Sequence, residues 1–323
     1  MQNKLKLGLV CISEQLKLVD KKKHSFQTMT RKRFNDLCNS VGRDKAISSL
    51  SKRVLHNILL TKDIVRHCID SDISHYRLSS SLFPLVTDQT IGLSIDDLTD
   101  ADSIIKQLKY LGILANKKVS IGSHPDQYNV LASQNQGAVG RTIDELNFQA
   151  KVFDLIGLPR DHSAPMNIHI NYSPKGSESM GDVAERFCKN LLRCNQGVIS
   201  RLTVENEDKG FWSVKNALLF NLHLKSKYNI CVPVCYDNLH DSCNGGVGAA
   251  QMRVNAELCK ATWPKGIVPV FHWSEGLPDK PRSHADYVAE GNFPFDMDVV
   301  FEVECKAKDM AIAKLKEQMA AAA

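Results

Sequence analysis

Short apolar runs alternate with longer amphipathic segments along most of the chain. Runs in which apolar and polar residues alternate predict β-strands, whereas segments in which apolar residues recur every three or four positions predict helices. Eight runs fit the strand pattern: LKLGLVCI (5–12), SHYRLSSSL (74–82), KKVSIGSH (117–124), MNIHINY (166–172), RLTVENED (201–208), NICVPVCYDNLH (229–240), GIVPVFHWSE (266–275) and DVVFEVECK (298–306).

The segments between these runs carry the helical pattern. Thr142, which is followed three residues later by an acid, has the pattern of an N-terminal capping box, and Gly157 follows an apolar helix end. The expected helices include residues 98–116, 142–158, 181–194, 213–228 and 249–263.

The alternation of strands and helices predicts a single-domain TIM (β/α)8 barrel. Parallel strands need crossover helices, and eight such units close the sheet; an open doubly wound sheet is the alternative. No GxGxxG motif follows the first strand and no GxxxxGK[ST] motif occurs, so no nucleotide cofactor is expected. In the absence of repeats and linkers we expect one domain over residues 1–318 and a disordered tail over 319–323.

The composition mainly excludes classes of protein. Hydrophobic residues make up 43% of the chain, and no apolar run approaches the roughly 18 residues that a membrane span needs. The first apolar run is expected to be a strand rather than a signal peptide, which favours a cytoplasmic location, near the nucleoid in a prokaryotic or viral host. The ten cysteines lack paired CxxC spacing and are expected to be free thiols.

A basic segment follows the first predicted strand. The net charge of +5 is modest, but residues 17–33 contain seven Lys and Arg residues. A solvated loop explains such a run as readily as contact with phosphates does. The candidates for phosphate contact are Lys21, Lys22, Lys23, Arg31 and Lys32.

Side chains that can bind metal ions fall at the ends of six predicted strands. In a TIM barrel the carboxyl ends of all strands meet at one face. A single histidine at a strand end is usually structural, but ligand-type residues at six strand ends favour a metal site. The residues are His124, His169, Glu205, Asp237, His240, His272 and Glu304, joined by His284 from the connection after the seventh strand.

Mixed histidine and carboxylate ligands suit zinc, manganese or iron better than calcium. The set is larger than one tetrahedral ion needs, so we expect two or three ions. Such clusters suit in-line displacement at phosphorus, because one ion lowers the pKa of the attacking water and another stabilises the leaving oxygen. We therefore predict phosphodiester hydrolysis; a metal-dependent sugar isomerase would use the same residue types.

The stretch VSIGSHPDQYNV places Gln127 and Tyr128 just beyond His124. A tyrosine there can simply pack on its own loop. Alternatively, an amide and an aromatic ring can fill the gap that opens when bases leave a DNA stack, which recovers part of the lost stacking. This second interpretation predicts a nuclease that probes DNA for damage.

The chain resembles the UV damage endonuclease family of the UvsE/UVDE type. The resemblance is carried, in this order, by YRLSSSLFPL, SHPDQY, NIHI, TVENED followed by W, VCYDNLH, VFHWSE, SHADY and FEVECKAK. It implies a TIM barrel similar to endonuclease IV, up to three divalent ions, and incision immediately 5′ of a UV-damaged dinucleotide in double-stranded DNA. Manganese is expected foremost, with magnesium or zinc as alternatives.

Carried over by the resemblance, the metal ligands fall on the eight residues named above, and Gln127 and Tyr128 probe the lesion. Glu205, Asp237 and Glu304 would hold and partly neutralise the catalytic ions. Incision would leave a 3′-hydroxyl and a 5′-phosphate at cyclobutane dimers and 6-4 photoproducts, with abasic sites as secondary substrates. We expect a monomer.

Three positions depart from the family pattern. Asp88 stands where a histidine ligand is expected, and Val270 stands where some members have a lysine that can be carboxylated. Near the first strand, Leu9 and Ser13 occupy places from which the resemblance implies contact with the lesion. These departures keep open a third function, that of a lesion-binding protein without turnover.

Overall fold

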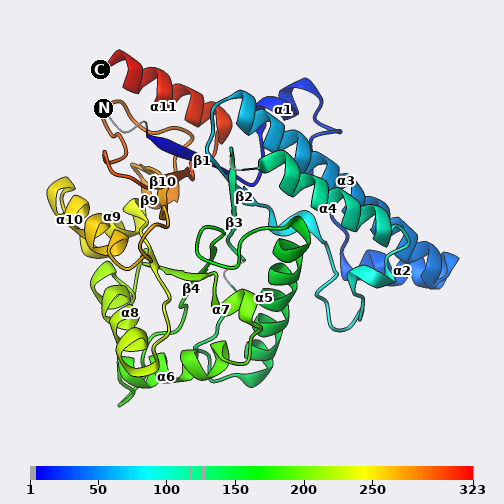
Figure 1. Ribbon diagram of the computed structural model, residues 1–323, viewed down its shortest axis with the longest axis horizontal. Coiled ribbons are helices and arrows are strands. Elements are labelled where there is room, and N and C mark those ends of the chain that lie inside the picture. Colours follow the sequence, from blue (N-terminus) through cyan, green and yellow to red (C-terminus); the bar gives the residue numbers. More distant parts are fainter. Residues whose placement is uncertain (1–4, 117, 126–127, 323) are drawn as a thin grey trace.

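The computed structural model describes residues 5–116, 118–125 and 128–322. Its centre is an eight-stranded parallel sheet in the order β6-β5-β4-β3-β2-β1-β10-β7 (Figure 1). Each of the eight predicted runs contains one of these strands. They are β1 (Lys6–Val10), β2 (His75–Leu78), β3 (Ser120–Ser123), β4 (Met166–His169), β5 (Leu202–Glu205), β6 (Val234–Cys235), β7 (Val270–Trp273) and β10 (Val300–Val303).

The two ends of the sheet, β6 and β7, meet in a single parallel bridge between Asp237 and His272. The backbone N–H of His272 also donates to the carbonyl of Tyr236 at 2.8 Å. The sheet is therefore a nearly closed barrel, as predicted, and the residues that close it are two of the predicted metal ligands.

Helices surround the barrel and bury the outward-facing apolar side chains of its strands, among them Tyr76, Phe271 and Phe301. The helices are α1 (Glu14–Val19), α2 (Arg31–Val41), α3 (Arg43–Asp70), α4 (Ala101–Ala115), α5 (Gln136–Ile156), α6 (Met180–Leu191), α7 (Gln196–Ile199), α8 (Val214–Tyr228), α9 (Asn238–Gly245), α10 (Ala249–Lys260) and α11 (Asp309–Ala321), with short 3-10 turns η1 (Ser80–Leu82) and η2 (Ile95–Asp97).

One predicted helix start was wrong. The cap of α5 is Asn135, whose side-chain oxygen accepts from the backbone N–H groups of Gly137 and Ala138. Thr142 lies inside the helix, where its buried hydroxyl accepts from Val130 and donates to the carbonyl of Ala138. The predicted end was correct, because Gly157 takes the left-handed conformation with φ 87°.

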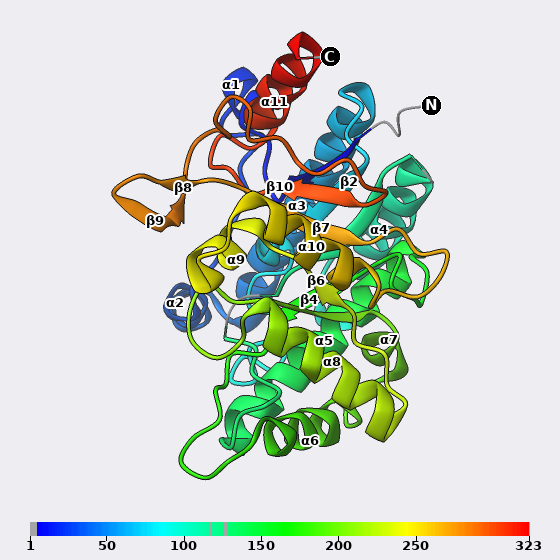
Figure 2. The same ribbon diagram turned by 90° about the vertical axis from the view of Figure 1, so that its left-hand side faces the viewer.

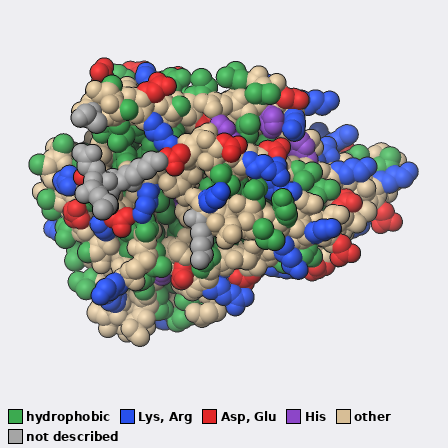
Figure 3. Space-filling model, turned by 45° about the horizontal axis from the view of Figure 1, so that its top comes forward, with side chains coloured by type: hydrophobic (Ala, Val, Ile, Leu, Met, Phe, Trp, Pro, Cys, Tyr) green, Lys and Arg blue, Asp and Glu red, His purple; other side chains and the backbone are tan. Residues whose placement is uncertain are grey.

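The helical hairpin of α2 and α3 forms an arm that extends beyond the barrel (Figure 1). The sequence-based list of helices did not include it, although α3 has an apolar stripe at Ala46, Leu50, Val54 and Ile58. Figure 3 shows Lys and Arg side chains, with acids among them, over this narrow end of the molecule.

A second small sheet was not predicted. β8 (Gly276–Leu277) and β9 (Lys280–His284) form an antiparallel hairpin that projects from the barrel after β7 (Figure 2). Gly276 pairs with His284 in this hairpin, so the chain returns to the end of β7. The segment that was expected to be a loop therefore holds His284 at a defined position.

At the carboxyl end of the chain, α11 continues to Ala321, beyond the boundary at residue 318 that the sequence suggested. The part of the expected tail up to that residue is helical rather than disordered. Among the helices of the described residues, none is long and apolar enough to cross a membrane.

Candidate metal centre

Alternate residues of the barrel strands point inward, and several of these residues are polar. His169 pairs with Glu205 across β4 and β5, and Glu302 pairs with His272 across β10 and β7. Asn167 lies two residues before His169 and donates to Oε2 of Glu205 at 2.7 Å. The period of two that predicted these strands thus also directs their polar side chains to one place.

Glu205 is the centre of this arrangement, with 1% of its surface exposed. Its Oε2 lies 2.9 Å from Nε2 of His124 and 4.0 Å from Nε2 of His169. Its Oε1 lies 3.0 Å from Nδ1 of His240 and 3.2 Å from Nδ1 of His272. One carboxylate thus faces four imidazoles that come from different parts of the chain.

Asp237 places His240 by capping α9. Its Oδ1 accepts from the backbone N–H of His240 at 2.7 Å, and its Oδ2 lies 3.6 Å from Nδ1 of His272. Glu304 follows β10 and brings Oε1 to 3.5 Å from the same Nδ1 of His272. His284 reaches the rim from β9, with Nε2 at 3.7 Å from Oε2 of Glu304.

These contacts define three overlapping groups of potential metal ligands. In each group the ligand atoms lie within 4.8 Å of one another. Oδ2 of Asp237 and Nδ1 of His272 are buried and have no hydrogen-bond partner among the described residues. Unpartnered buried polar atoms are costly, and a divalent ion would satisfy both of them. The groups are His124–His169–Glu205, Glu205–Asp237–His240 and Asp237–His272–Glu304.

The carboxylates and His169 are in the charge state that suits a cation, whereas His240 carries a proton. Burial acts to raise the pKa of Glu205, but His272 and hydrogen bonds from His124 and His240 hold that pKa well below its usual value. Burial lowers the pKa of His169 to about 4, so its ring is neutral at pH 7 and offers a lone pair. Burial opposes the charge of His240, but Asp237 and Glu205 outweigh it and raise the pKa of His240 to about 11.

Asp88, the ninth predicted ligand, is engaged elsewhere. Its Oδ2 accepts from Nε of Arg31 at 2.7 Å and its Oδ1 accepts from the hydroxyl of Thr90 at 2.6 Å. Asp88 and His124 line the same cavity, which has a volume of about 1190 Å³. Asp88 thus belongs to the wall of the cavity beside the metal ligands, and no group of three potential ligands in the described part of the chain includes it.

Tyr128 lies on the rim of the same cavity with 81% of its surface exposed. An exposed aromatic ring beside the metal ligands fits the probing role better than a ring that packs on its own loop. Gln127 lies outside the described residues. Leu9 and Ser13 are both buried, and the hydroxyl of Ser13 donates to Asp309.

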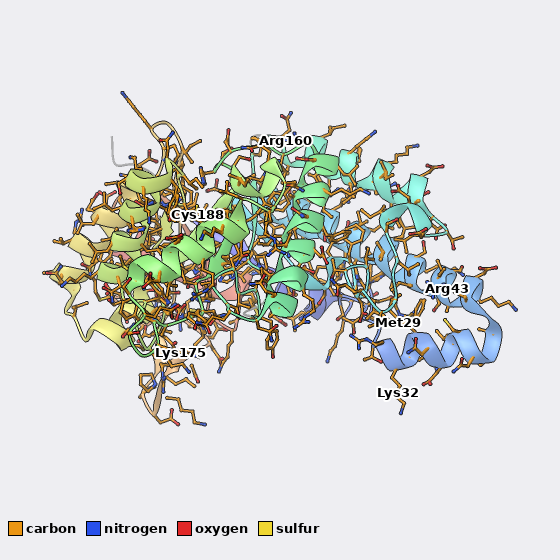
Figure 4. The ribbon with its side chains drawn as sticks, turned by 90° about the horizontal axis from the view of Figure 1, so that it is seen from below. Met29, Lys32, Arg43, Arg160, Lys175 and Cys188 are labelled. Atoms are coloured by element: carbon orange, nitrogen blue, oxygen red, sulfur yellow. The ribbon has the colours of Figure 1, made fainter. Side chains whose placement is uncertain are left out.

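The basic candidates are exposed, as expected for either interpretation. Lys21, Lys22 and Lys23 lie in the turn between α1 and α2, where Nζ of Lys23 is 3.7 Å from Asp63. Arg31 and Lys32 begin α2, and Lys32 points outward from that helix (Figure 4).

The sequence analysis missed four residues of the barrel interior. Glu302 lies two residues before Glu304 and His75 lies two residues before Arg77, so each pair shares the inward face. The period of two places them on the inward faces of their strands, although Arg77, unlike Glu302 and His75, is not a metal-ligand type. The missed residues are Arg77, Glu302, His75 and Asn167.

Glycines leave room for this inner layer. A Cβ on Gly8 would lie 3.1 Å from Cγ of Glu302, and a Cβ on Gly122 would lie 3.1 Å from Nε2 of His75. Both are tighter than ordinary contacts between side chains. The two glycines thus let buried polar side chains fill the barrel beneath the metal ligands.

The fold and the site define a class of TIM barrel in which side chains that could bind metal ions gather at the carboxyl ends of the strands. The sequence profile described as UV-endonuclease UvdE matches residues 5–322. The chain belongs to this family, which confirms the resemblance and makes the chain an endonuclease.

Individual relatives carry corresponding names. The UV DNA damage endonuclease of Nostoc sp. (strain PCC 7120 / SAG 25.82 / UTEX 2576) is 30% identical over 96% of this chain and 89% of its own. The UV DNA damage endonuclease of Bacillus velezensis is 27% identical over 91% of this chain and 89% of its own.

Solved structures confirm the fold. The crystal structure of SacUVDE superposes with a TM-score of 0.78 at 24% identity and covers 98% of this chain and 99% of its own. Endonuclease IV from Thermus thermophilus reaches a TM-score of 0.53 at 16% identity, over 81% of this chain and 94% of its own.

Proposed function

We propose that the protein is a UV damage endonuclease that hydrolyses the DNA phosphodiester immediately 5′ of a UV-damaged dinucleotide. The observation that carries the proposal is the convergence of four imidazoles on the buried carboxylate of Glu205 at the mouth of the barrel. Family membership supplies the reaction class, and the names of the relatives supply the substrate.

The proposed ions are two or three divalent cations, manganese foremost, held by the three groups that share Glu205 and Asp237. His284 is the proposed additional ligand at the rim, and Asp88, which is paired with Arg31, lines the cavity beside the ligands. Divalent ions in such a site activate water and stabilise the charge that develops on the phosphate oxygens.

The residues of this chain prepare that chemistry. The carboxylates of Glu205 and Glu304 keep their charge despite burial, because neighbouring cationic groups lower their pKa values. His169 is unprotonated at neutral pH, and Asp237 fixes the direction of His240 through the cap of α9. The site is thus organised before an ion or DNA arrives.

Selectivity for damage would come from the energy of extruding bases. A damaged dinucleotide stacks poorly, so rotating it out of the duplex costs less than extruding intact bases. Tyr128, with Gln127, would fill the vacated space and contact the orphaned bases opposite the lesion. Cyclobutane dimers and 6-4 photoproducts are the expected substrates, and abasic sites are secondary ones.

Contacts to the DNA backbone are assigned to the exposed basic residues near the barrel mouth and on the arm. Arg31 has a particular place among them, because it lines the cavity together with Tyr128 and His124. Lys32 continues the basic surface along α2. The other candidates are Lys21, Lys22 and Lys23.

A gel-shift experiment separates the three functions that the sequence left open. Damaged and intact duplexes are mixed with the protein in EDTA, and Mn²⁺ is then added. We expect preferential binding of the damaged duplex in EDTA and a nick after Mn²⁺. Retention without a nick would indicate a lesion-binding protein, and failure to bind either duplex would leave a sugar isomerase as the better hypothesis.

A further inference from the structure

Arg77 lies inside the barrel at the carboxyl end of β2, with 8% of its side chain exposed. Its Nε donates to Oε2 of Glu302 at 2.6 Å, and its Nη2 donates to the same oxygen. Its Nη1 lies 2.5 Å from Oε1 of Glu304, and its Nη2 lies 2.7 Å from Nε2 of His272. One guanidinium thus contacts two of the candidate metal ligands.

Balancing the charge of Glu302 does not require these additional contacts. Glu302 also faces two imidazoles, with Oε1 at 3.0 Å from Nε2 of His75 and Oε2 at 3.2 Å from Nε2 of His272. A lysine could supply the same charge, but only the planar fork of an arginine reaches Glu302, Glu304 and His272 together. The geometry therefore points to a role of Arg77 toward the metal ligands themselves.

An arginine is always charged and has no acceptor, so it cannot bind a metal ion. Where Nη1 of Arg77 holds Oε1 of Glu304, that oxygen is less available to a cation. Nη2 of Arg77 lies 2.7 Å from Nε2 of His272, so its fixed positive charge sits beside a second ligand of this group. Both effects oppose an ion in the Asp237–His272–Glu304 group.

The other two groups are not affected in this way. The side-chain hydrogen bonds and ion pairs of Arg77 with described residues go to Glu302, Glu304 and His272, and none goes to a ligand of the His124–His169–Glu205 or Glu205–Asp237–His240 groups. The fixed positive charge also lies nearest to the group that contains Glu304. Repulsion between it and a second cation weakens with distance, so the groups around Glu205 are favoured.

We propose that Arg77 is a positioning residue that ranks the metal sites, so that ions occupy the two groups containing Glu205 first and the Asp237–His272–Glu304 group last. This inference rests on the proposed metal centre. It adds that the last ion is held at least tenfold more weakly than the first, and that Arg77 causes the difference.

The test is a Mn²⁺ titration of the whole protein without DNA, in which the electron paramagnetic resonance signal reports free Mn²⁺ and calorimetry reports each class of site. The unaltered protein should show a tight and a weaker class. Arg77→Met should tighten the weaker class about tenfold or more, because it removes the charge and releases Oε1 of Glu304. Arg77→Lys keeps the charge but lacks the fork that reaches Glu304, so it should tighten the weaker class less than Arg77→Met does.

Arg186→Met is the matched control. Nη1 of Arg186 pairs with Glu178 at 2.6 Å, and neither residue belongs to the metal-ligand groups. This variant should bind Mn²⁺ as the unaltered protein does. A single class of sites in the unaltered protein would overturn the proposal, as would Arg77→Met binding with unchanged affinities. Equal tightening in Arg77→Lys and Arg77→Met would show that the charge is not the cause.

A measurement on the unaltered protein avoids the risk that Arg77→Met does not fold. Crystals with two equivalents of Mn²⁺ should show anomalous scattering at the groups containing Glu205 and little between His272 and Glu304. Equal occupancy there would overturn the ranking while leaving the proposed nuclease intact. A protein that nicks damaged DNA but fills all its metal sites equally would refute only the ranking. A protein that binds no Mn²⁺ would refute the proposed metal-dependent nuclease itself.

Discussion

Glu205 and Asp309 are both buried carboxylates, yet their surroundings differ in kind. Asp309 begins α11 and accepts from the hydroxyl of Ser13 and from the backbone N–H of Glu14 at 2.7 Å. Nε2 of His67 lies 2.9 Å away. Asp309 therefore joins α1, α3 and α11. Two of its partners, a hydroxyl and a backbone amide, do not titrate.

Glu205 instead faces imidazoles, whose nitrogens can either donate a proton or bind an ion. Oδ2 of Asp237 and Nδ1 of His272, which have no hydrogen-bond partner in the described part of the chain, lie beside it. A buried carboxylate whose partners are fixed donors is a structural joint. One whose partners are several imidazoles, which can exchange protons for metal ions, suits a binding site.

Replacing Glu205 should have the largest effect on function. Glu205→Gln keeps the shape but removes the charge that two ligand groups share, so incision should fall about a thousandfold or more. Binding of damaged duplex in EDTA and the folded state should persist. Incision is measured on a labelled duplex with Mn²⁺, with Glu178→Gln as a control outside the metal centre. Full activity of Glu205→Gln would remove Glu205 from the ligand set.

Replacing Asp309 should do the opposite. Asp309→Ala leaves the hydroxyl of Ser13 and the amide of Glu14 without their acceptor, and should lower the free energy of unfolding by about 3 kcal/mol. Urea denaturation measures this loss. The affinity for Mn²⁺ should stay within about twofold of the original. If Asp309→Ala kept its stability but lost Mn²⁺ binding, the assignment of Asp309 to structure and of Glu205 to metal binding would be wrong.

Mn²⁺ binding should depend on pH through His240. Without metal, the pKa of His240 is raised from 6.5 to about 11, so the ring is protonated at neutral pH and an ion must displace this proton. Apparent affinity should therefore rise between pH 6 and 8, by about tenfold per pH unit for each proton displaced. Calorimetry in buffers of different ionisation enthalpy counts the released protons, and affinity that is flat with pH would contradict this expectation.

The stability of the metal-free protein should change with pH in the opposite direction to its affinity for Mn²⁺. Because the pKa of His240 is raised on folding, its charged ring stabilises the metal-free protein fully below about pH 6.5, and this contribution is lost as the pH rises through about 11. Metal-free protein should thus become less stable across the range in which its affinity for Mn²⁺ increases. His240→Gln should reduce both effects.

Tyr128→Ala should have the smallest effect, confined to recognition. Stacking of a base on an aromatic ring is worth about 1 kcal/mol at the low end, so discrimination between damaged and intact duplex should fall about fivefold. Fluorescence anisotropy in EDTA gives the two affinities, and Mn²⁺ binding should not change. Tyr110→Ala, an exposed tyrosine on α4, is the matched control. Unchanged discrimination would mean that Tyr128 only packs on its loop.

Most of the metal centre could be predicted because one period governs both its strands and its ligands. The alternation that marks β4 and β5 as strands also places His169 and Glu205 on the inward face. The bridge between Asp237 and His272 depends on pairing across the barrel, which no local pattern reveals, whereas the cap that Asp237 forms on α9 is a local contact with the N–H of His240.

Other features escaped the sequence for physical reasons. Arg77 occupies an inward position whose meaning depends on Glu302 and Glu304, more than two hundred residues away in the chain. Asp88 was expected among the ligands, but its position is set by Arg31, the first residue of a helix that was not predicted. Leu9 and Ser13 lie in the core and in a cap, where tertiary packing decides their contacts.

The central claim is that the buried carboxylate of Glu205 organises a metal centre that cuts DNA beside a UV lesion. The most direct measurement is incision of a labelled duplex that carries one defined thymine dimer, with and without Mn²⁺. The account predicts one Mn²⁺-dependent nick immediately 5′ of the dimer, with a 3′-hydroxyl and a 5′-phosphate. A folded, Mn²⁺-loaded protein that leaves this duplex intact would contradict it.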